Sequence, residues 1–179
     1  MQKIKYLAID TDGTLTDGNY NVADNGTLTK SFYTRDFWAI EEGLLKSGEY
    51  KVTIVTQASD NCIEHRCKGL LKRYPKNFFV YKGVDDKYRF IDSVIGPLIP
   101  WHSDVIVKKA GIDPWESVFY IGDAENDLKC IEAAGRSACP SDAIPIVKEK
   151  ASFVCEQRGG RGAVYEAIMH YLEIQAKWK

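Results

Sequence analysis

The chain lacks long hydrophobic runs and has no excess of charge of either sign. No apolar run reaches the roughly 18 residues that a membrane-spanning helix needs. Its 24 basic and 25 acidic residues give a formal net charge of −1, and the basic residues are spread along the chain. The sequence therefore indicates no nucleic-acid or membrane surface. The first apolar segment starts at Ile4, which leaves no room for a signal peptide, and we expect a cytoplasmic location.

The cysteines have no regular spacing. The five cysteines form no framework and are odd in number, which predicts reduced thiols. Cys62, His65 and Cys67 are close in sequence but lack the Cys-x-x-Cys spacing of zinc sites. On a helix, Cys62 and Cys67 would point about 140° apart, given ~100° per residue. We therefore predict no metal site there.

Internal repeats, low-complexity segments and an insertion long enough for a second domain are also missing. A chain of 179 residues can bury a core, and we expect one domain over residues 1–179. Strand-like and helix-like segments alternate, which favours an α/β fold with a parallel sheet and helices on both faces. The expected strands span residues 4–10, 52–56, 78–81, 117–121, 137–139 and 153–154. The expected helices span residues 37–46, 60–74, 85–94, 128–134 and 144–148, with a last helix from Gly162 onward.

A polar hairpin is expected between the first strand and the first helix. Residues 19–22 and 27–33 flank the turn 23–26, in which Asn-Gly is a strong hairpin signal. Asp36 is the expected cap of the helix that follows. Further along, Gly96-Pro97 is expected to end a helix, with a loop over 96–102 and a short helix after Ser103.

The stretch Asp10-Thr11-Asp12-Gly13-Thr14-Leu15-Thr16-Asp17-Gly18 carries the strongest chemical signal. It follows the first apolar strand directly, so both Asp10 and Asp12 lie where the strand ends. In open α/β sheets, ligands bind at the carboxyl ends of the strands. Two carboxylates one residue apart, fixed by a glycine turn, can supply a nucleophile, an acid/base and a hard-cation site. An Asp-Gly pair alone would indicate only a turn.

Two further candidate residues follow the next strands. Thr56 ends the second strand, where its hydroxyl can donate to a phosphoryl oxygen or act as an ordinary cap. Lys87 lies at a helix start, where the helix dipole favours anions, and this position suits a lysine that points at a bound phosphate. Lys82 is the competing candidate, and a solvated surface position is the common state of either lysine.

A second acidic segment follows the strand at 117–121. Asp123 can complete a magnesium site and Asp127 can support it, although both also suit the first turn of a helix. Together the segments can transfer a phosphoryl group. One carboxylate attacks phosphorus, a metal and a lysine neutralise the phosphoryl oxygens, and a second carboxylate moves the proton.

The order Asp-x-Asp, Thr, Lys and Gly-Asp-x-x-x-Asp resembles the haloacid dehalogenase (HAD) superfamily, whose fold is Rossmann-like, from Ile4 to Asp127. A narrower resemblance is to its small branch without a large cap domain. That branch includes phosphatases of 3-deoxy-D-manno-octulosonate 8-phosphate (KDO 8-phosphate) and of nine-carbon keto-sugar acids, and domains of some sialic-acid-activating enzymes. The narrower match rests on three segments: residues 15–18 with the hairpin, 81–87, and Gly159-Gly160-Arg161-Gly162-Ala163-Val164-Tyr165-Glu166.

The resemblance implies roles for individual residues. Asp10 would be the nucleophile and Asp12 the general acid/base, with Mg²⁺ held by Asp10, the backbone carbonyl of Asp12, and Asp123. The remaining residues would bind the phosphoryl group or substrate, or support the site: Thr56, Gln57, Lys87, Asn126 and Asp127. Arg161 would meet a substrate carboxylate, or else be a flexible loop arginine. The hairpin flap 19–33 would reach a neighbouring subunit of a homotetramer.

The sequence departs from the branch pattern at Gln57-Ala58, Phe37-Trp38, Ala124, Tyr165 and the segment 96–103. Most of these positions lie where the branch reads its substrate, so they leave the particular sugar acid open. We expect a Mg²⁺-dependent phosphomonoesterase that acts on a phosphorylated keto-sugar acid. The alternatives are a phosphatase of another small sugar phosphate or nucleotide, and a non-catalytic HAD-like assembly domain.

Overall fold

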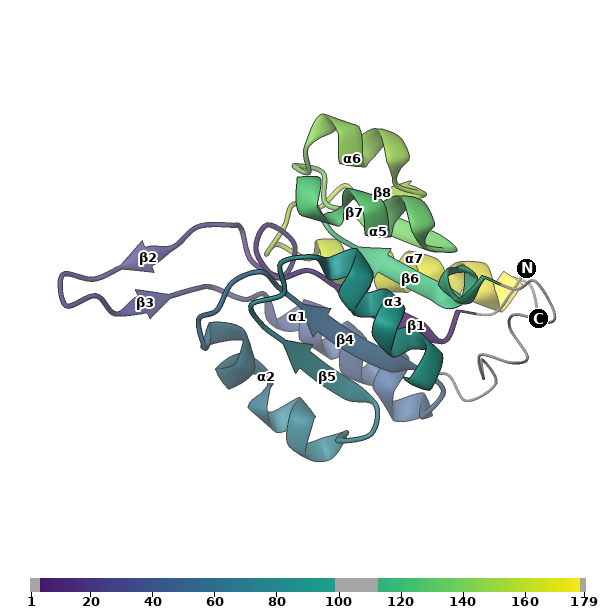
Figure 1. The fold of residues 1–179 in the computed structure, drawn as a ribbon, viewed down its shortest axis with the longest axis horizontal. Helices are drawn as coiled ribbons and strands as arrows, with labels where there is room; N and C mark the ends of the chain where they lie inside the picture. The colour runs from purple at the N-terminus through teal and green to yellow at the C-terminus, as the bar shows by residue number, and fades with distance from the viewer. Residues whose placement is uncertain (1–3, 99–112, 178–179) are drawn as a thin grey trace.

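The computed structural model describes residues 4–98 and 113–177, and this part of the chain forms a six-stranded parallel sheet (Figure 1). The strand order is β5-β4-β1-β6-β7-β8, and every neighbouring pair is parallel. The strands are β1 (Tyr6–Ile9), β4 (Lys51–Val55), β5 (Phe78–Tyr81), β6 (Val118–Ile121), β7 (Arg136–Cys139) and β8 (Phe153–Val154). The predicted Rossmann-like α/β class is confirmed. The expectation of a single domain over 1–179 stays a prediction, because it includes residues outside this description.

Helices lie on both faces of the sheet (Figure 1), and each face is packed into a hydrophobic cluster. Leu7 and Ile9 of β1 belong to one hydrophobic cluster, and Tyr6 and Ala8 belong to the other, because successive side chains of a strand point to opposite faces. The first cluster is covered by α1 (Thr34–Trp38), a π-helical segment (Ala39–Leu44), α2 (Cys62–Arg73) and α7 (Ala163–Lys177). The second is covered by α3 (Lys87–Leu98), α5 (Leu128–Ala133) and α6 (Pro145–Lys150). Short 3₁₀ segments occupy Leu45–Ser47, Pro114–Ser117 and Glu125–Asp127.

The hairpin flap extends away from the rest of the chain (Figure 1). Its paired segments, β2 (Asn21–Val22) and β3 (Leu28–Thr29), are antiparallel and shorter than expected. Gly26 has a φ of 80°, and the Thr27 amide donates to the side chain of Asn25. The predicted turn is therefore present, whereas most of the flap's length is unpaired chain.

The expectation that Asp36 caps its own helix is wrong. The helix begins at Thr34, so Asp36 lies in its first turn and is fully buried. Its Oδ1 atom instead accepts a hydrogen bond of 2.8 Å from the amide of Tyr165, at the start of α7. Asp36 therefore accepts from the first turn of α7 and not from its own helix, although Tyr165 is 129 positions away in sequence. This contact is possible because α1 and α7 pack against each other on the same face of the sheet.

Other element boundaries shift by a few residues. Helix α3 continues through Gly96-Pro97 to Leu98, because the φ of proline is close to a helical value and the pair weakens a helix without forbidding it. Of the expected loop 96–102, residues 99–102 lie outside the described chain, as does the short helix expected after Ser103. All five cysteines are free thiols. Among the described residues, no helix combines the length and apolarity needed to cross a membrane.

The buried carboxyl group of Asp36 predicts a pH-dependent stability. Burial raises its pKa from 3.8 to about 6, so between these values the folded chain holds a proton that the unfolded chain has lost. The free energy of unfolding from this group should therefore fall as the pH rises from 4 to 6, by at most about 1.4 kcal/mol per pH unit. The variant Asp36→Asn keeps a capping oxygen and should lose this slope in urea titrations across that range.

Asp24→Asn is the matched control, since Asp24 is exposed in the flap turn. It should retain the pH dependence of the unaltered chain. Parallel stability curves for the Asp36→Asn variant and the unaltered chain would contradict the prediction.

Candidate active site

The candidate site lies at the carboxyl edge of the sheet, around the end of β1. The chain runs from β1 to β4 on one side and later to β6 on the other, so β1 is the point where the strand order reverses. Ligands of open α/β sheets bind at such a point. Asp10, Thr56 and Gly122 directly follow β1, β4 and β6, and the Asp10 amide donates to the carbonyl of Ile121. Segments far apart in sequence are thereby brought to one edge.

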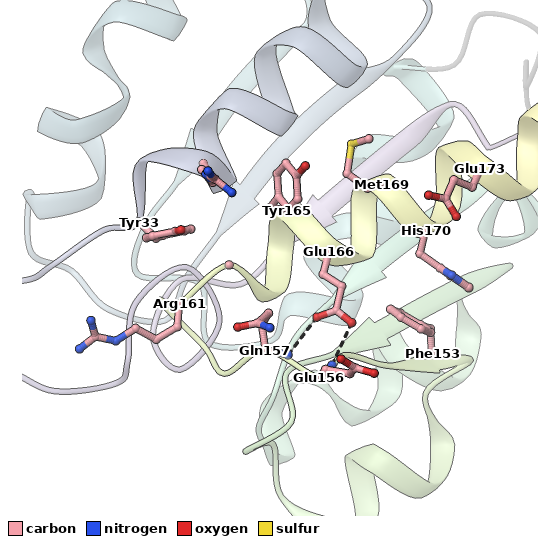
Figure 2. Close-up of a pocket in the computed structure, with 12 residues that line it drawn as sticks. Tyr33, Phe153, Glu156, Gln157, Arg161, Tyr165, Glu166, Met169, His170 and Glu173 are labelled. Carbon is pink, nitrogen blue, oxygen red and sulfur yellow. Dashed lines mark hydrogen bonds between the residues drawn. The ribbon is translucent and has the colours of Figure 1, made fainter.

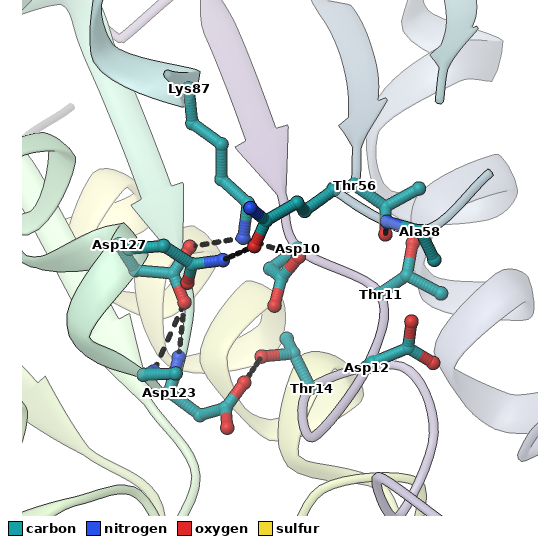
Figure 3. A network of polar contacts seen from close by, with 12 residues as sticks. Asp10, Thr11, Asp12, Thr14, Thr56, Ala58, Lys87, Asp123 and Asp127 are labelled. Carbon is teal, nitrogen blue, oxygen red and sulfur yellow. Dashed lines mark hydrogen bonds and ion pairs between the residues drawn. The ribbon is translucent and has the colours of Figure 1, made fainter. Parts of the chain in front are cut away.

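A buried lysine joins two carboxylates at the centre of the site (Figure 3). The Nζ atom of Lys87 lies 2.6 Å from Oδ1 of Asp10 and 2.7 Å from Oδ1 of Asp127. All three side chains are nearly inaccessible to water. The competing Lys82 is at the surface, where it pairs with Glu64 at 2.8 Å. The structure therefore places Lys87, and not Lys82, beside the aspartates.

Asp127 holds the loop after β6 in place. Its Oδ1 atom also accepts a hydrogen bond of 2.6 Å from the hydroxyl of Tyr120, and its Oδ2 atom accepts from the amides of Asp123 and Ala124. A Cβ atom on Gly122 would lie 2.5 Å from the carboxyl carbon of Asp127. The Gly-Asp-x-x-x-Asp pattern is thus explained by contacts within the loop.

Asp123 is positioned by the loop that follows β1. Its Oδ1 atom accepts a hydrogen bond of 2.8 Å from the hydroxyl of Thr14. Gly13 has a φ of 89°, and a Cβ atom there would lie 2.1 Å from Oδ2 of Asp123. Gly13 is therefore required both by the turn and by the carboxylate that lies against it.

The site has an excess of negative charge. Burial raises the pKa of Asp10 well above its usual range, and the nearby charge of Asp127 adds to this effect against the opposing charge of Lys87. Burial likewise raises the pKa of Asp123 to about 6. Burial would lower the pKa of Lys87, but the charges of Asp10 and Asp127 outweigh it and raise the value.

This charge suits a divalent cation. Asp10, Asp123 and Asp127 each offer an oxygen within 4.8 Å of the others, so three carboxylates face the single ammonium of Lys87. Carboxylate oxygens are the ligands that hard divalent cations prefer. The donor set therefore fits such an ion.

The side chain of Asp12 lies apart from this cluster, and Figure 3 shows its carboxylate turned away from that of Asp123. Its Oδ1 and Oδ2 atoms lie 2.8 Å and 2.9 Å from Nζ of Lys30, which also lies 2.7 Å from Oδ2 of Asp60. Burial would lower the pKa of Lys30, but its hydrogen bonds to Asp12 and Asp60 raise the value. Sequence reasoning missed Lys30, since a lysine in a polar hairpin carries no signal of burial.

The remaining predicted residues divide between two places. Thr56 is buried, and its hydroxyl oxygen accepts from the amide of Ala58 at 3.1 Å in the loop before α2, which begins at Cys62, so it caps no helix and its hydroxyl hydrogen can still be donated. Asn126 donates to Oε1 of Gln57 at 3.3 Å and so links the loops after β6 and β4. Arg161 lies elsewhere, on a cleft of about 620 Å³ beside Tyr33 and α7 (Figure 2).

The loop that carries Arg161 packs on the Asp-x-Asp loop. A Cβ atom on Gly159 would lie 1.9 Å from the carbonyl oxygen of Gly13, and one on Gly160 would lie 2.6 Å from the amide nitrogen of Asp17. The carboxylate of Glu166 accepts hydrogen bonds of 2.9 Å from two amides that precede this loop. The glycines therefore allow two loops to touch backbone to backbone.

Comparison with known proteins identifies relatives along nearly the whole chain. The family of haloacid dehalogenase-like hydrolases matches residues 105–168. The 3-deoxy-D-manno-octulosonate 8-phosphate phosphatase KdsC of Escherichia coli (strain K12) is 33% identical over 176 residues, which cover 98% of this chain and 83% of the relative.

Two solved structures are also similar. The 3-deoxy-D-manno-octulosonate 8-phosphate phosphatase from Moraxella catarrhalis, in complex with a magnesium ion, a phosphate ion and a KDO molecule, is 27% identical with a TM-score of 0.75. That match covers 98% of this chain and 94% of the other. The cobalt-bound phosphatase YrbI from Haemophilus influenzae is 28% identical with a TM-score of 0.75, over 98% and 91% of the two chains.

The Lys87 interactions predict a large difference between two lysine variants. Lys87→Met leaves two buried carboxylates without their cation and should lower the free energy of unfolding by about 3–5 kcal/mol. Lys82→Met, which removes an exposed ion pair, should have a much smaller effect. Urea titrations in the presence of a chelator measure both. Equal losses for the two variants would contradict this, because the buried pairs would then stabilise the fold no more than the exposed pair does.

Proposed function

The chain belongs to the haloacid dehalogenase-like hydrolases, as a phosphatase related to the KDO 8-phosphate phosphatases, and we propose that it hydrolyses a phosphomonoester through an aspartyl-phosphate. The observation that carries this proposal is the buried pair of Asp10 and Lys87 at the carboxyl edge of the sheet. A carboxylate held beside an ammonium in a dry site suits attack on phosphorus, because the ammonium offsets the charge of the phosphoryl oxygens.

We propose Mg²⁺ as the metal, in view of the magnesium-bound Moraxella catarrhalis structure and the carboxylate oxygens gathered here. Asp10 and Asp123 would hold it with the backbone carbonyl of Asp12. Asp127 would support rather than ligate, since its oxygens already accept from Tyr120, Lys87 and two amides. When bound, the ion neutralises charge on the phosphoryl oxygens.

The proposed reaction has two steps. In the first, the carboxylate of Asp10 attacks phosphorus, the bond from phosphorus to the leaving oxygen breaks, and Asp12 gives that oxygen a proton. In the second, Asp12 takes a proton from a water molecule that attacks the aspartyl-phosphate, which releases phosphate and frees Asp10. Lys87 and Thr56 would hold the phosphoryl oxygens, and the exposed Gln57 and Asn126 would contact the substrate.

The proposed substrate is a phosphorylated keto-sugar acid, KDO 8-phosphate or a nine-carbon analogue. This class is supported by the similar proteins from Escherichia coli and Moraxella catarrhalis, which are both 3-deoxy-D-manno-octulosonate 8-phosphate phosphatases. The exposed Trp38, whose ring lies 6.2 Å from that of Tyr165, forms an aromatic surface next to Arg35. Contact of Arg161 with the substrate carboxylate stays a prediction, as does the cytoplasmic location.

We also propose a homotetramer in which the tip of the flap reaches a neighbouring subunit. The flap extends from the body, and Tyr20 and Val22 on it are 50% and 65% exposed. Apolar side chains on a projecting ribbon suit burial against a partner. Sedimentation equilibrium at micromolar concentration should give a tetramer, and a monomer there would contradict this assembly.

The function is tested by phosphate release from a panel of phosphomonoesters, with Mg²⁺ and with a chelator. The panel contains eight- and nine-carbon keto-sugar acid phosphates, hexose phosphates and nucleotides. We expect metal-dependent release from a keto-sugar acid phosphate and a loss of at least about 10³-fold in Asp10→Asn, because the nucleophile is removed. The exposed Asp85→Asn is the control and should remain active.

The outcomes separate the candidate functions. Release only from hexose phosphates or nucleotides would keep the mechanism and change the substrate class. Full activity of the Asp10→Asn variant would contradict the aspartyl-phosphate. No release from any member of the panel would favour a non-catalytic assembly domain.

A further inference from the structure

We propose that Lys30 of the flap is a positioning residue that orients the carboxylate of Asp12 for proton transfer to the leaving group. The inference rests on the proposed function, in which Asp12 is the acid/base. It concerns a residue in another element, 18 positions away in sequence. Lys30 itself would touch neither phosphorus nor the leaving oxygen.

The first observation is the burial of Lys30. It follows β3 on the returning arm of a flap whose other residues are mostly exposed, yet its side chain is only 1% exposed. Its Nζ atom lies 4.5 Å from the centre of the Tyr20 ring, on the outgoing arm of the flap. A buried ammonium is costly unless it is paired, so these contacts fix its position.

The second observation is how Lys30 contacts Asp12. Its Nζ atom lies 2.8 Å from one carboxylate oxygen and 2.9 Å from the other, so the ammonium faces both. The other contacts of this carboxylate are longer, at 3.3 Å from the hydroxyl of Thr16 and 3.5 Å from that of Tyr20. Lys30 therefore has the strongest hold on the direction in which the carboxylate points.

The third observation is that Lys30 is itself anchored to the body of the protein. Its Nζ atom lies 2.7 Å from Oδ2 of Asp60, in the loop between β4 and α2. The other oxygen of Asp60 accepts a hydrogen bond of 2.9 Å from the amide of Cys62, which fixes that carboxylate. Asp60, which lies outside the Asp-x-Asp loop, therefore fixes the position of the Lys30 ammonium. The ammonium in turn orients the carboxylate of Asp12.

Each aspartate of the Asp-x-Asp motif consequently forms an ion pair with a different lysine. Lys87 of the body pairs with Asp10, and Lys30 of the flap pairs with Asp12. Orientation of the second pair matters because a proton donor must lie within hydrogen-bond distance of the leaving oxygen. The simpler alternative is that Lys30 only fastens the flap, and the test must separate the two roles.

The test compares two substrates that differ in their need for a proton donor, phenyl phosphate and p-nitrophenyl phosphate. The nitrophenolate leaves readily without a proton, whereas phenolate does not. The ratio kcat/KM reports steps up to departure of the leaving group, so attack of water on the aspartyl-phosphate does not affect it. In Lys30→Met we expect kcat/KM to fall by about tenfold or more for phenyl phosphate, and by much less for p-nitrophenyl phosphate.

Three variants serve as controls. Lys30→Arg keeps the positive charge and should recover most of the phenyl phosphate activity. Asp60→Asn loosens the anchor but keeps the Asp12 pair, so its loss should be smaller and in the same direction. Combined with Asp12→Asn, the Lys30→Met change should have no further effect on the ratio of the two substrates, because Lys30 acts through Asp12.

Equal losses for the two substrates in Lys30→Met would overturn the proposal and leave Lys30 as a flap anchor. Thermal melting checks folding, and Lys30→Gln undergoes the same comparison if the methionine variant does not fold. Failure of the proposed function is distinguishable, because it would appear as an inactive unaltered chain or as an active Asp10→Asn variant. An unaltered chain that hydrolyses neither aryl phosphate nor any member of the phosphomonoester panel would overturn both inferences.

Discussion

The structure depends on one buried ammonium between two carboxylates. Lys87 joins Asp10, at the end of the central strand, to Asp127, which in turn fixes the loop after the neighbouring strand. Without this cation, the like charges of the two aspartates would repel each other in a site from which water is excluded. Because Lys87 is the first residue of α3, its ion pairs place the start of that helix beside Asp10 and Asp127. They also bring the loops after β1 and β6 close together.

Glycine allows the rest of the site to close around that centre. Gly13 and Gly122 admit carboxylates against the backbone, and Gly159 and Gly160 let the C-terminal loop touch the Asp-x-Asp loop. Any side chain at these positions would separate the segments. The acidic cluster and its polar surroundings are thus held by backbone contacts, which suits a site that must keep several negative charges together.

Much of the fold followed from the sequence pattern, because apolar strands alternating with amphipathic helices leave few arrangements other than a parallel sheet. The expected strands at 78–81 and 153–154 are confirmed to the residue. The helix near Asp36 was misplaced, since its first turn is fixed by packing against α7 and not by local capping. The hairpin turn at Asn25-Gly26 was identified, but the short pairing of the flap was not.

By itself the sequence determined which residues could form the site, since carboxylates, a threonine and a lysine follow or flank the predicted strands. The local pattern left Lys82 as a competitor, and only the family resemblance favoured Lys87. No pattern indicated Lys30. Only the tertiary structure decided that Lys87 is buried with Asp10 and that the Lys30 ammonium lies between Asp12 and Asp60. The physical reason is that burial and pairing of a charge depend on residues brought together from distant parts of the chain, which no local pattern encodes.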